Sequence, residues 1–157
     1  MIPDEFVEMA QTYRLLSGLD PQQLRKLLPL AEEKQFPAGR IIFVEGDKSA
    51  FLHLIVSGDV ALGTAIEDRT VRVQTLHPGE AMGWSALTAD SVTHFQARSL
   101  SPVSTVAFAG ERLREACDRD PEMGYALMKR LFELLTERLD ATRLQVLRAH
   151  AQPEPAR

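Results

Sequence analysis

The stretch FLHLIVSGDVALGTAI, residues 51–66, decides what kind of fold this chain has. Two apolar runs rich in leucine and β-branched residues flank the dipeptide Gly58-Asp59, and glycine and aspartate favour the turns that join strands. A further run, TVRVQTL at 70–76, follows after the polar residues around Asp68. Short strands separated by such turns predict an antiparallel sandwich or barrel.

The same pattern continues on both sides of this stretch. Further strands are predicted at 40–44, 93–99 and 102–108. Upstream, Asp20 is a helix N-cap and Pro21 occupies the first helical position, which is a start signal. Leu24, Leu27, Leu28 and Ala31 then recur at helical spacing. The residues therefore predict helices within 1–35 and a β-region over 36–109.

After Gly110 the sequence returns to helix. The segment 121–147 follows acidic residues and ends among basic ones, which suits the helix dipole. Two apolar stripes run along it: the first, with spacings of four and three, is Met128, Phe132, Leu135, Leu139, Thr142 and Val146, and the second is Leu127, Leu131 and Leu134. The spacing of the first stripe is that of a coiled-coil seam, so it predicts that the helix pairs with the same helix of a second copy in a homodimer. The second stripe is predicted to pack on the β-region. The alternative is that both stripes form one broad face of the helix that packs on the core of the domain. Residues 151–157 are predicted to be disordered.

Composition narrows the class of protein. A chain of 157 residues is long enough for one domain, which we predict over 1–150. The net charge of −4 argues against a surface that binds nucleic acid. The single cysteine, Cys117, fits a reducing compartment. The N-terminus lacks a signal-peptide pattern, and no apolar run approaches the roughly 20 residues of a membrane span. We therefore expect a cytoplasmic location and no membrane contact.

Three segments of the sequence resemble those of a known family. They are LLSGLDPQQLRKLLPLAEEKQFPAGRIIFVEGD (15–47), LHLIVSGDVAL (52–62) and PGEAMGWSAL (78–87). In this order, and with the long C-terminal helix, the chain resembles the cyclic nucleotide-binding domain of the CRP/FNR type over about residues 10–147. The resemblance implies an α+β fold: an antiparallel β-roll, or double-stranded jelly roll, with N-terminal helices and a long C-terminal dimerisation helix.

The resemblance also places a phosphate-binding cassette after Pro78-Gly79-Glu80, with its last matched position at Thr93. In the family a short helix offers backbone N–H groups to a cyclic phosphate, a glutamate binds the ribose and an arginine pairs with the phosphate. Here the small-residue opening is kept by Gly83, Ser85, Ala86 and Leu87. Trp84 stands at the glutamate position and Thr93, followed by His94, at the arginine position, and no arginine lies between Gly83 and Gln96.

The missing charges have a cost, and other residues are candidates to offset it. Two hydrogen bonds to charged groups are worth about 3–6 kcal/mol together. Strand alternation turns Arg98 outward, away from the roll interior. Trp84 is expected either to stack on a ligand or to fill the sugar pocket. The resemblance places Thr142 where the family presents a hydroxyl to the purine, and Arg143, which follows it, could bring charge from a partner chain. The candidate ligand-binding residues are Gly83, Trp84, Ser85, Ala86, Leu87, Thr93, His94, Thr142 and Arg143.

These observations favour a non-catalytic regulatory module. It is expected to sense cAMP, cGMP or a related anion and to signal through the C-terminal helix. Motifs of common enzyme classes and zinc-ligand spacings are not found in the sequence. The family's transcription factors carry a helix-turn-helix after this helix, but only about ten residues follow Leu147, so we expect output through a partner protein and no direct DNA binding.

Two alternatives remain open at this stage. The first is a ligand-free scaffold with a degenerate pocket, which the replacement of both charged cassette residues favours. The second is a haem-based sensor, because some family members hold haem. Its candidate ligands are His53, His77, His94, Met82 and Cys117, which form no motif.

Overall fold

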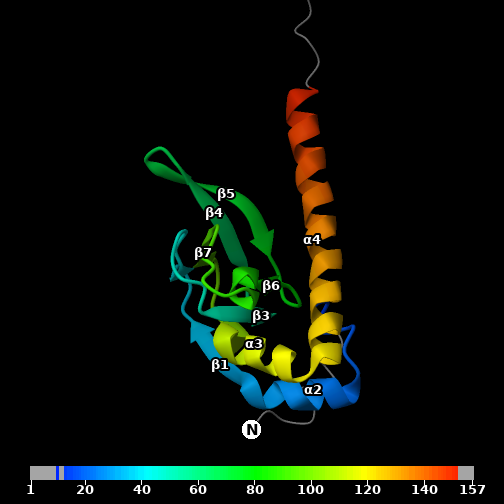
Figure 1. Ribbon diagram of the computed structural model, residues 1–157. Helices are drawn as coiled ribbons and strands as arrows, with labels where there is room; N and C mark the ends of the chain where they lie inside the picture. The colour runs from blue at the N-terminus through cyan, green and yellow to red at the C-terminus, as the bar shows by residue number, and fades with distance from the viewer. Residues whose placement is uncertain (1–9, 11–12, 152–157) are drawn as a thin grey trace, which may run out of the picture.

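The structure, a computed structural model, describes residue 10 and residues 13–151 (Figure 1). Within these residues, short helices precede eight short strands, which one 3₁₀ helix interrupts, and a short and a long helix follow. They are α2 (Pro21–Leu27), the 3₁₀ helix η1 (Leu28–Leu30), β1 (Ala31–Phe36), β2 (Ile41–Phe43), β3 (Phe51–Ser57), β4 (Val60–Ile66), β5 (Arg69–Leu76), β6 (Ala81–Met82), the 3₁₀ helix η2 (Trp84–Leu87), β7 (Gln96–Ser99), β8 (Val103–Ala109), α3 (Gly110–Arg119) and α4 (Pro121–His150).

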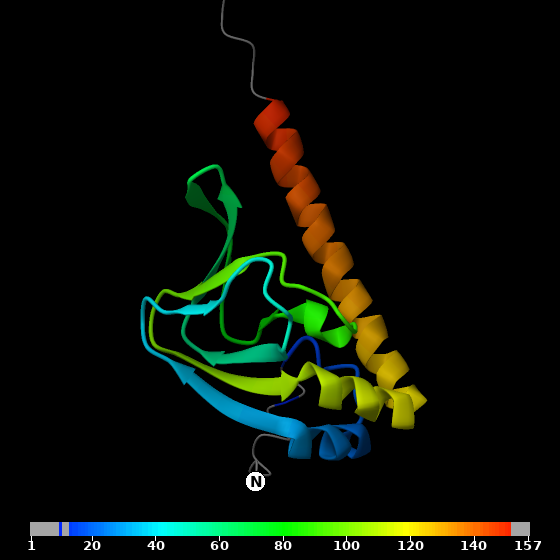
Figure 2. The ribbon, with the colours of Figure 1, turned by 60° about the vertical axis from the view of Figure 1, so that its left-hand side comes forward.

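The eight described strands form two antiparallel sheets of four. The strand orders are β1-β8-β3-β6 and β2-β7-β4-β5. The central pair of the first sheet, β3 and β8, comes from segments far apart in sequence, with Leu52 opposite Phe108. The second sheet contains the β4–β5 hairpin, which projects from the roll (Figure 2). The predicted α+β fold with an antiparallel β-roll is confirmed.

The boundary between the first helices and the roll differs from the prediction. Residues 31–35, expected to be helical, belong to β1, which pairs with β8 from Ala31 opposite Phe108 to Phe36 opposite Val103. Pro29 explains the change, because proline has no N–H for the helical ladder and disfavours a helical residue before it. The chain tightens into η1 and then extends. Residues 1–9, 11–12 and 152–157, which include nearly all of the predicted disordered tail, lie outside the described residues.

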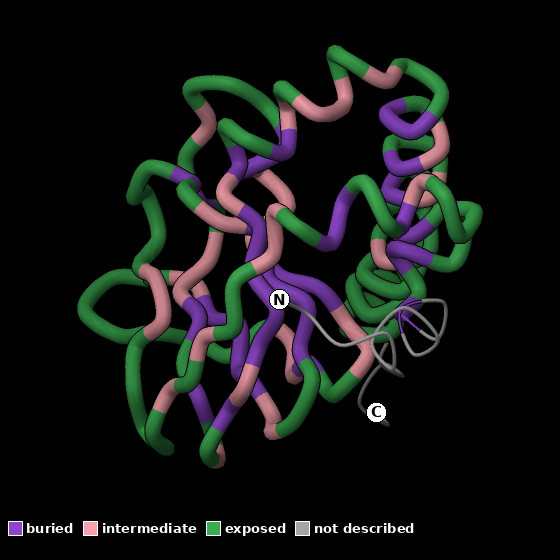
Figure 3. Tube along the Cα trace, turned by 90° about the horizontal axis from the view of Figure 1, so that it is seen from below, coloured by how far each residue is buried: buried purple, intermediate pink, exposed green. Residues whose placement is uncertain are grey.

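Buried side chains form two clusters on opposite faces of the first sheet. One lies between the helices and that sheet and includes Leu24, Leu54, Phe108 and Leu127. The other lies inside the roll, around Ile55. Figure 3 shows the buried positions gathered in the central strands and in the helical turns packed against them. The two clusters hold the helices and the roll together as one body.

Helix α4 is packed on the roll for only half of its length. Leu127, Leu131 and Leu134 are buried, whereas every residue from Leu139 to His150 is exposed. Figures 1 and 2 show the C-terminal half of α4 projecting beyond the roll. The second apolar stripe therefore packs on the domain as predicted, and Phe132 and Leu139 of the first stripe are about 70% exposed. No helix in the described part of the chain is long and apolar enough to cross a membrane.

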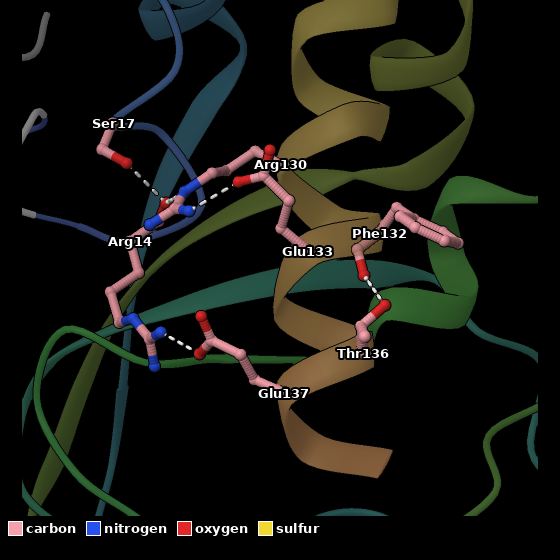
Figure 4. Close-up of polar contacts among 7 residues, drawn as sticks. All are labelled: Arg14, Ser17, Arg130, Phe132, Glu133, Thr136 and Glu137. Atoms are coloured by element: carbon pink, nitrogen blue, oxygen red, sulfur yellow. Dashed lines mark hydrogen bonds and ion pairs between the residues drawn. The ribbon is translucent and has the colours of Figure 1, made fainter. Parts of the chain in front are cut away.

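Polar contacts with the residues before α2 anchor this packed half of α4 (Figure 4). The Arg14 guanidinium pairs with the Glu137 carboxylate, and Arg130 Nε donates a hydrogen bond to the Arg14 carbonyl at 2.5 Å. Arg130 also pairs with Glu133 at 2.9 Å. These contacts fix α4 as far as the turn that contains Arg138.

Candidate functional site

The cassette begins with a backbone bend that only glycine fits well. Gly83 has φ = 78°, and a Cβ built there would lie 2.4 Å from the carbonyl oxygen of Phe51. A side chain would meet both the left-handed backbone penalty and a steric clash. Gly83 thus lets the chain pass close over β3 and start η2 directly beneath α4.

A cavity of about 380 Å³ lies between η2, the roll interior and α4. Its size falls in the range of small-molecule sites. Most of its wall is apolar, and its lining residues come from both ends of the fold. They are Phe43, Leu62, Met82, Gly83, Trp84, Ser85, Leu87, Thr88, Ser91, Thr93, His94, Phe95, Met128, Leu131, Leu135 and Arg138.

Six of the nine predicted site residues line this cavity: Gly83, Trp84, Ser85, Leu87, Thr93 and His94. The other three do not. Ala86 is buried, and its carbonyl accepts a hydrogen bond from Arg114 at 2.7 Å. Thr142 and Arg143 are exposed on α4, one turn beyond the cavity, and Thr142 Oγ1 donates to the Arg138 carbonyl at 2.9 Å. Within the described chain, α4 therefore reaches the cavity through Arg138 rather than through Thr142 or Arg143.

The hydroxyl groups of the cavity wall are already engaged by the protein. Ser85 bonds to Ser49, and Thr88 bonds to Ser91. Thr93 Oγ1 donates to the Val44 carbonyl at 2.5 Å. Where the family has an arginine, this chain thus uses threonine to hold the 44–47 loop. Few hydroxyls remain for the sugar or base of a ligand.

Arg138 is the charged residue that sequence reasoning missed. Its guanidinium carbon lies 4.0 Å from the centre of the Trp84 ring, a cation–π contact. Burial lowers the pKa of this guanidinium from its usual value, and the negative charge of Glu80 offsets part of the shift. A sequence signal existed: Arg138 continues the buried stripe of Leu127, Leu131 and Leu134, so it had to face the roll.

Trp84 divides its surface between core and cavity. It is half-buried and packs against the buried cluster beneath the helices. It also lines the cavity without filling it, since the cavity of 380 Å³ remains beside it. Its indole N–H is the one fully buried side-chain polar group in the described residues that has no hydrogen-bond partner. An unpaired buried donor costs about 1–3 kcal/mol. The site therefore holds a donor that lacks an acceptor next to a cation.

A second, smaller cavity of about 240 Å³ lies on the other side of Trp84 and Arg138. Its wall includes Glu80, whose carboxylate accepts a hydrogen bond from the His77 backbone N–H at 2.7 Å. Glu80 thus stabilises the turn that precedes β6. Arg98 is exposed on β7, which agrees with its predicted outward direction.

The five candidate haem ligands are spread over the fold. Met82 and His94 line the cavity. His53 is buried and hydrogen-bonded to Thr105 at 3.1 Å, and His77 pairs with Asp59 at 2.8 Å. Cys117 lies in α3, where burial raises the pKa of its thiol. Within the described ranges, no three histidine, cysteine or acidic side chains are grouped to hold a metal ion.

Comparison with known proteins decides the family. A model of the cyclic nucleotide-binding domain matches residues 33–120. The chain belongs to the cyclic nucleotide-binding domain family. The match covers the roll, the cassette and α3, so the resemblance drawn from the three sequence segments is confirmed.

Individual relatives of this cyclic nucleotide-binding domain agree. A crystal structure from Geobacter metallireducens GS-15, assigned to the cyclic nucleotide-binding proteins, is 32% identical over 88% of this chain and 99% of its own, with a TM-score of 0.76. A cyclic nucleotide-binding domain from Methylobacillus flagellatus KT shares the fold, with 17% identity, 97% and 88% coverage and a TM-score of 0.82. The CRP-like cAMP-activated global transcriptional regulator of Mycobacterium tuberculosis is 24% identical over 73% of this chain and 52% of its length. The chain thus spans about half the length of this curated relative.

Proposed function

We propose that this domain is a non-catalytic regulatory module that binds a small anion in the 380 Å³ cavity and signals through α4. One observation carries the proposal: cassette residues and α4 residues line the same cavity. A ligand that touches both can shift the position of α4 by its differential affinity for two arrangements. Membership of the family makes cAMP or cGMP the first candidate ligand, and the M. tuberculosis relative is described as cAMP-activated.

The output element of the proposal is the exposed apolar seam of α4. Phe132, Leu139 and Val146 are exposed by 51% or more, and the spacings of three and four match a helix that pairs with another helix. We propose that a second copy of the chain covers this seam, giving a homodimer that a partner protein reads. The net charge of −4 gives no support to direct binding of DNA.

Isothermal titration with cAMP and cGMP tests the ligand. The cassette lacks the family's glutamate and arginine, so about 3–6 kcal/mol of interaction is absent. Relative to a micromolar site, we therefore expect a Kd from roughly 0.2 mM to tens of millimolar. Saturable heat supports the module. No heat from either nucleotide or from any other organic anion at millimolar concentration would sink the proposal and leave the ligand-free scaffold, which Trp84 at the glutamate position already favours.

A further inference from the structure

The wall of the 380 Å³ cavity has one half-buried cation, and none of its lining residues is an acid. Among its described lining residues, Arg138 is the one arginine or lysine, and aspartate and glutamate are absent. His94 is the other side chain there that can carry charge, and it is exposed. The Arg138 guanidinium makes no hydrogen bond or ion pair with any described residue, and its contact is the face of the Trp84 ring. Glu80, in the smaller cavity on the other side of Arg138, acts on the guanidinium through its charge but makes no ion pair with it. On the side of the larger cavity, the half-buried guanidinium is therefore open to an anion from outside the chain.

The rest of the wall is suited to an apolar group. Apolar side chains, among them Phe43, Leu62, Met82, Leu131 and Leu135, form most of it. The hydroxyls of the wall each have a partner within the protein: Ser85 bonds to Ser49, Thr88 to Ser91, and Thr93 to the Val44 carbonyl. A sugar in this cavity would have to share these hydroxyls with their present partners in largely apolar surroundings, which is unfavourable. An alkyl or aryl group would not.

We propose that Arg138 on α4 is the anion-binding residue of this domain and that the ligand is an organic anion with a largely apolar body. This assignment rests on the proposed ligand-sensing function, and it specifies the chemical class of the ligand that the domain would sense. The apolar body fills the roll interior, and the anionic group pairs with Arg138 beside the Trp84 indole. Arg138 is also the last half-buried residue of α4, because every residue after it is exposed. The anion would thus act on α4 at the point where it leaves the roll.

Octanoate and 1-octanol are the matched probes, because they differ in charge and share the same alkyl chain. Trp84 is the chain's one tryptophan, so its fluorescence reports ligand in the cavity, and titration calorimetry gives the affinity. We expect octanoate to bind at least about 10-fold more tightly than octanol. Equal affinity for the two probes would overturn the assignment of an anion site.

Arg138→Gln tests the residue itself. It should weaken octanoate by about 10- to 100-fold and leave octanol unchanged, and Arg138→Lys should restore part of the loss. Lys129→Gln is the matched control, because Lys129 is exposed on the same helix and does not line the cavity. Thermal unfolding checks that each variant is folded, and the octanol titration checks that the cavity is intact.

The outcomes separate this inference from the proposed function. If cAMP binds saturably and equally well to wild type and Arg138→Gln, while octanoate does not bind, the regulatory module stands and the assignment of Arg138 fails. If octanoate binds but Arg138→Gln has the affinity of wild type, the cavity is a ligand site and Arg138 is not its anion partner. If neither octanoate nor a cyclic nucleotide binds, both proposals fail.

Discussion

At the scale of single residues, the site depends on where a side chain is absent as much as on where one is present. Gly83 and Gly79 both have positive φ angles, 78° and 93°. They differ in surroundings, because a Cβ at Gly83 would lie 2.4 Å from the Phe51 carbonyl oxygen, whereas one at Gly79 meets nothing within 4 Å. A side chain at Gly79 would therefore strain the backbone alone, whereas one at Gly83 would also clash with the backbone of β3.

This difference gives the first prediction. Gly79→Ala should lower the free energy of unfolding by about 1–2 kcal/mol through backbone strain alone. Gly83→Ala should cost about 1–3 kcal/mol more, because the β3 backbone must also move. Urea unfolding of both variants measures the two losses. Equal losses would mean that η2 and β3 relax freely, and the cassette geometry would then not depend on Gly83.

His53 gives a second prediction at this scale. Its ring is buried among Phe36, Phe51 and Thr105, and burial, helped by the charge of Lys34, lowers its pKa to about 4. The unfolded pKa is near 6.5, so between those values the unfolded chain binds more protons. The contribution of neutral His53 is therefore complete above pH 6.5 and is lost as pH falls toward 4.

Chemical unfolding at pH 7.5 and pH 5 measures this loss. From the two pKa values, His53 should contribute about 2 kcal/mol to the decrease in the free energy of unfolding. His53→Gln should reduce the decrease by that amount, whatever its effect at pH 7.5. His77→Gln is the control, because His77 is exposed. A pH dependence that is the same in His53→Gln and wild type would contradict a buried neutral imidazole.

At the scale of elements, the start of α2 is set by local chemistry. Asp20 Oδ1 accepts a hydrogen bond from the Gln23 N–H at 2.8 Å, and Gln23 Oε1 accepts from the Asp20 N–H at 3.0 Å. This capping box is expected to contribute about 1 kcal/mol. Asp20→Ala should lose it, whereas Asp20→Asn, which keeps an acceptor, should lose only a fraction. Urea unfolding distinguishes them, and equal losses would show that the cap's oxygen is not what stabilises α2.

The same element shows how far sequence reasoning extends. The cap and Pro21 predicted the start of α2, and Gly58-Asp59 predicted the turn between β3 and β4, because both signals are local. The end of the helical region was misplaced, because Ala31 fits a helical stripe as well as a strand. Its pairing with Phe108 arises from a contact across the chain, which no local pattern contains.

The site follows the same division. Gly83, Trp84 and Thr93 were found because they belong to one contiguous motif. Arg138 was missed, because its contact with Trp84 exists only once α4 folds back over η2. Thr142 and Arg143 lie one turn too far along α4 to line the cavity of their own chain. Their proposed role in ligand binding is therefore one for the dimer, where a partner helix could bring them to the site.

At the scale of the whole molecule, the candidate ligand cavity and the proposed dimer seam share side chains. Met128 and Leu135 line the cavity and also belong to the seam with Phe132 and Leu139. An occupied cavity fixes the rotamers of Met128 and Leu135, and these rotamers form part of the surface offered to a second helix. We therefore expect dimer affinity and ligand affinity to be linked, each changing the other by the same factor.

The last prediction tests the seam. Phe132→Gln combined with Leu139→Gln should shift the chain from a dimer to a monomer of 17.5 kDa in light scattering, because both side chains are about 70% exposed in the single chain and neither lines the cavity. Glu133→Gln combined with Asp140→Asn, one residue further along at each site, should leave the mass unchanged. If the seam variant remains dimeric, another surface holds the copies together. A seam variant that becomes monomeric should also lose ligand affinity. If this loss equals the factor by which ligand strengthens the wild-type dimer, Met128 and Leu135 carry the signal from the cavity to α4.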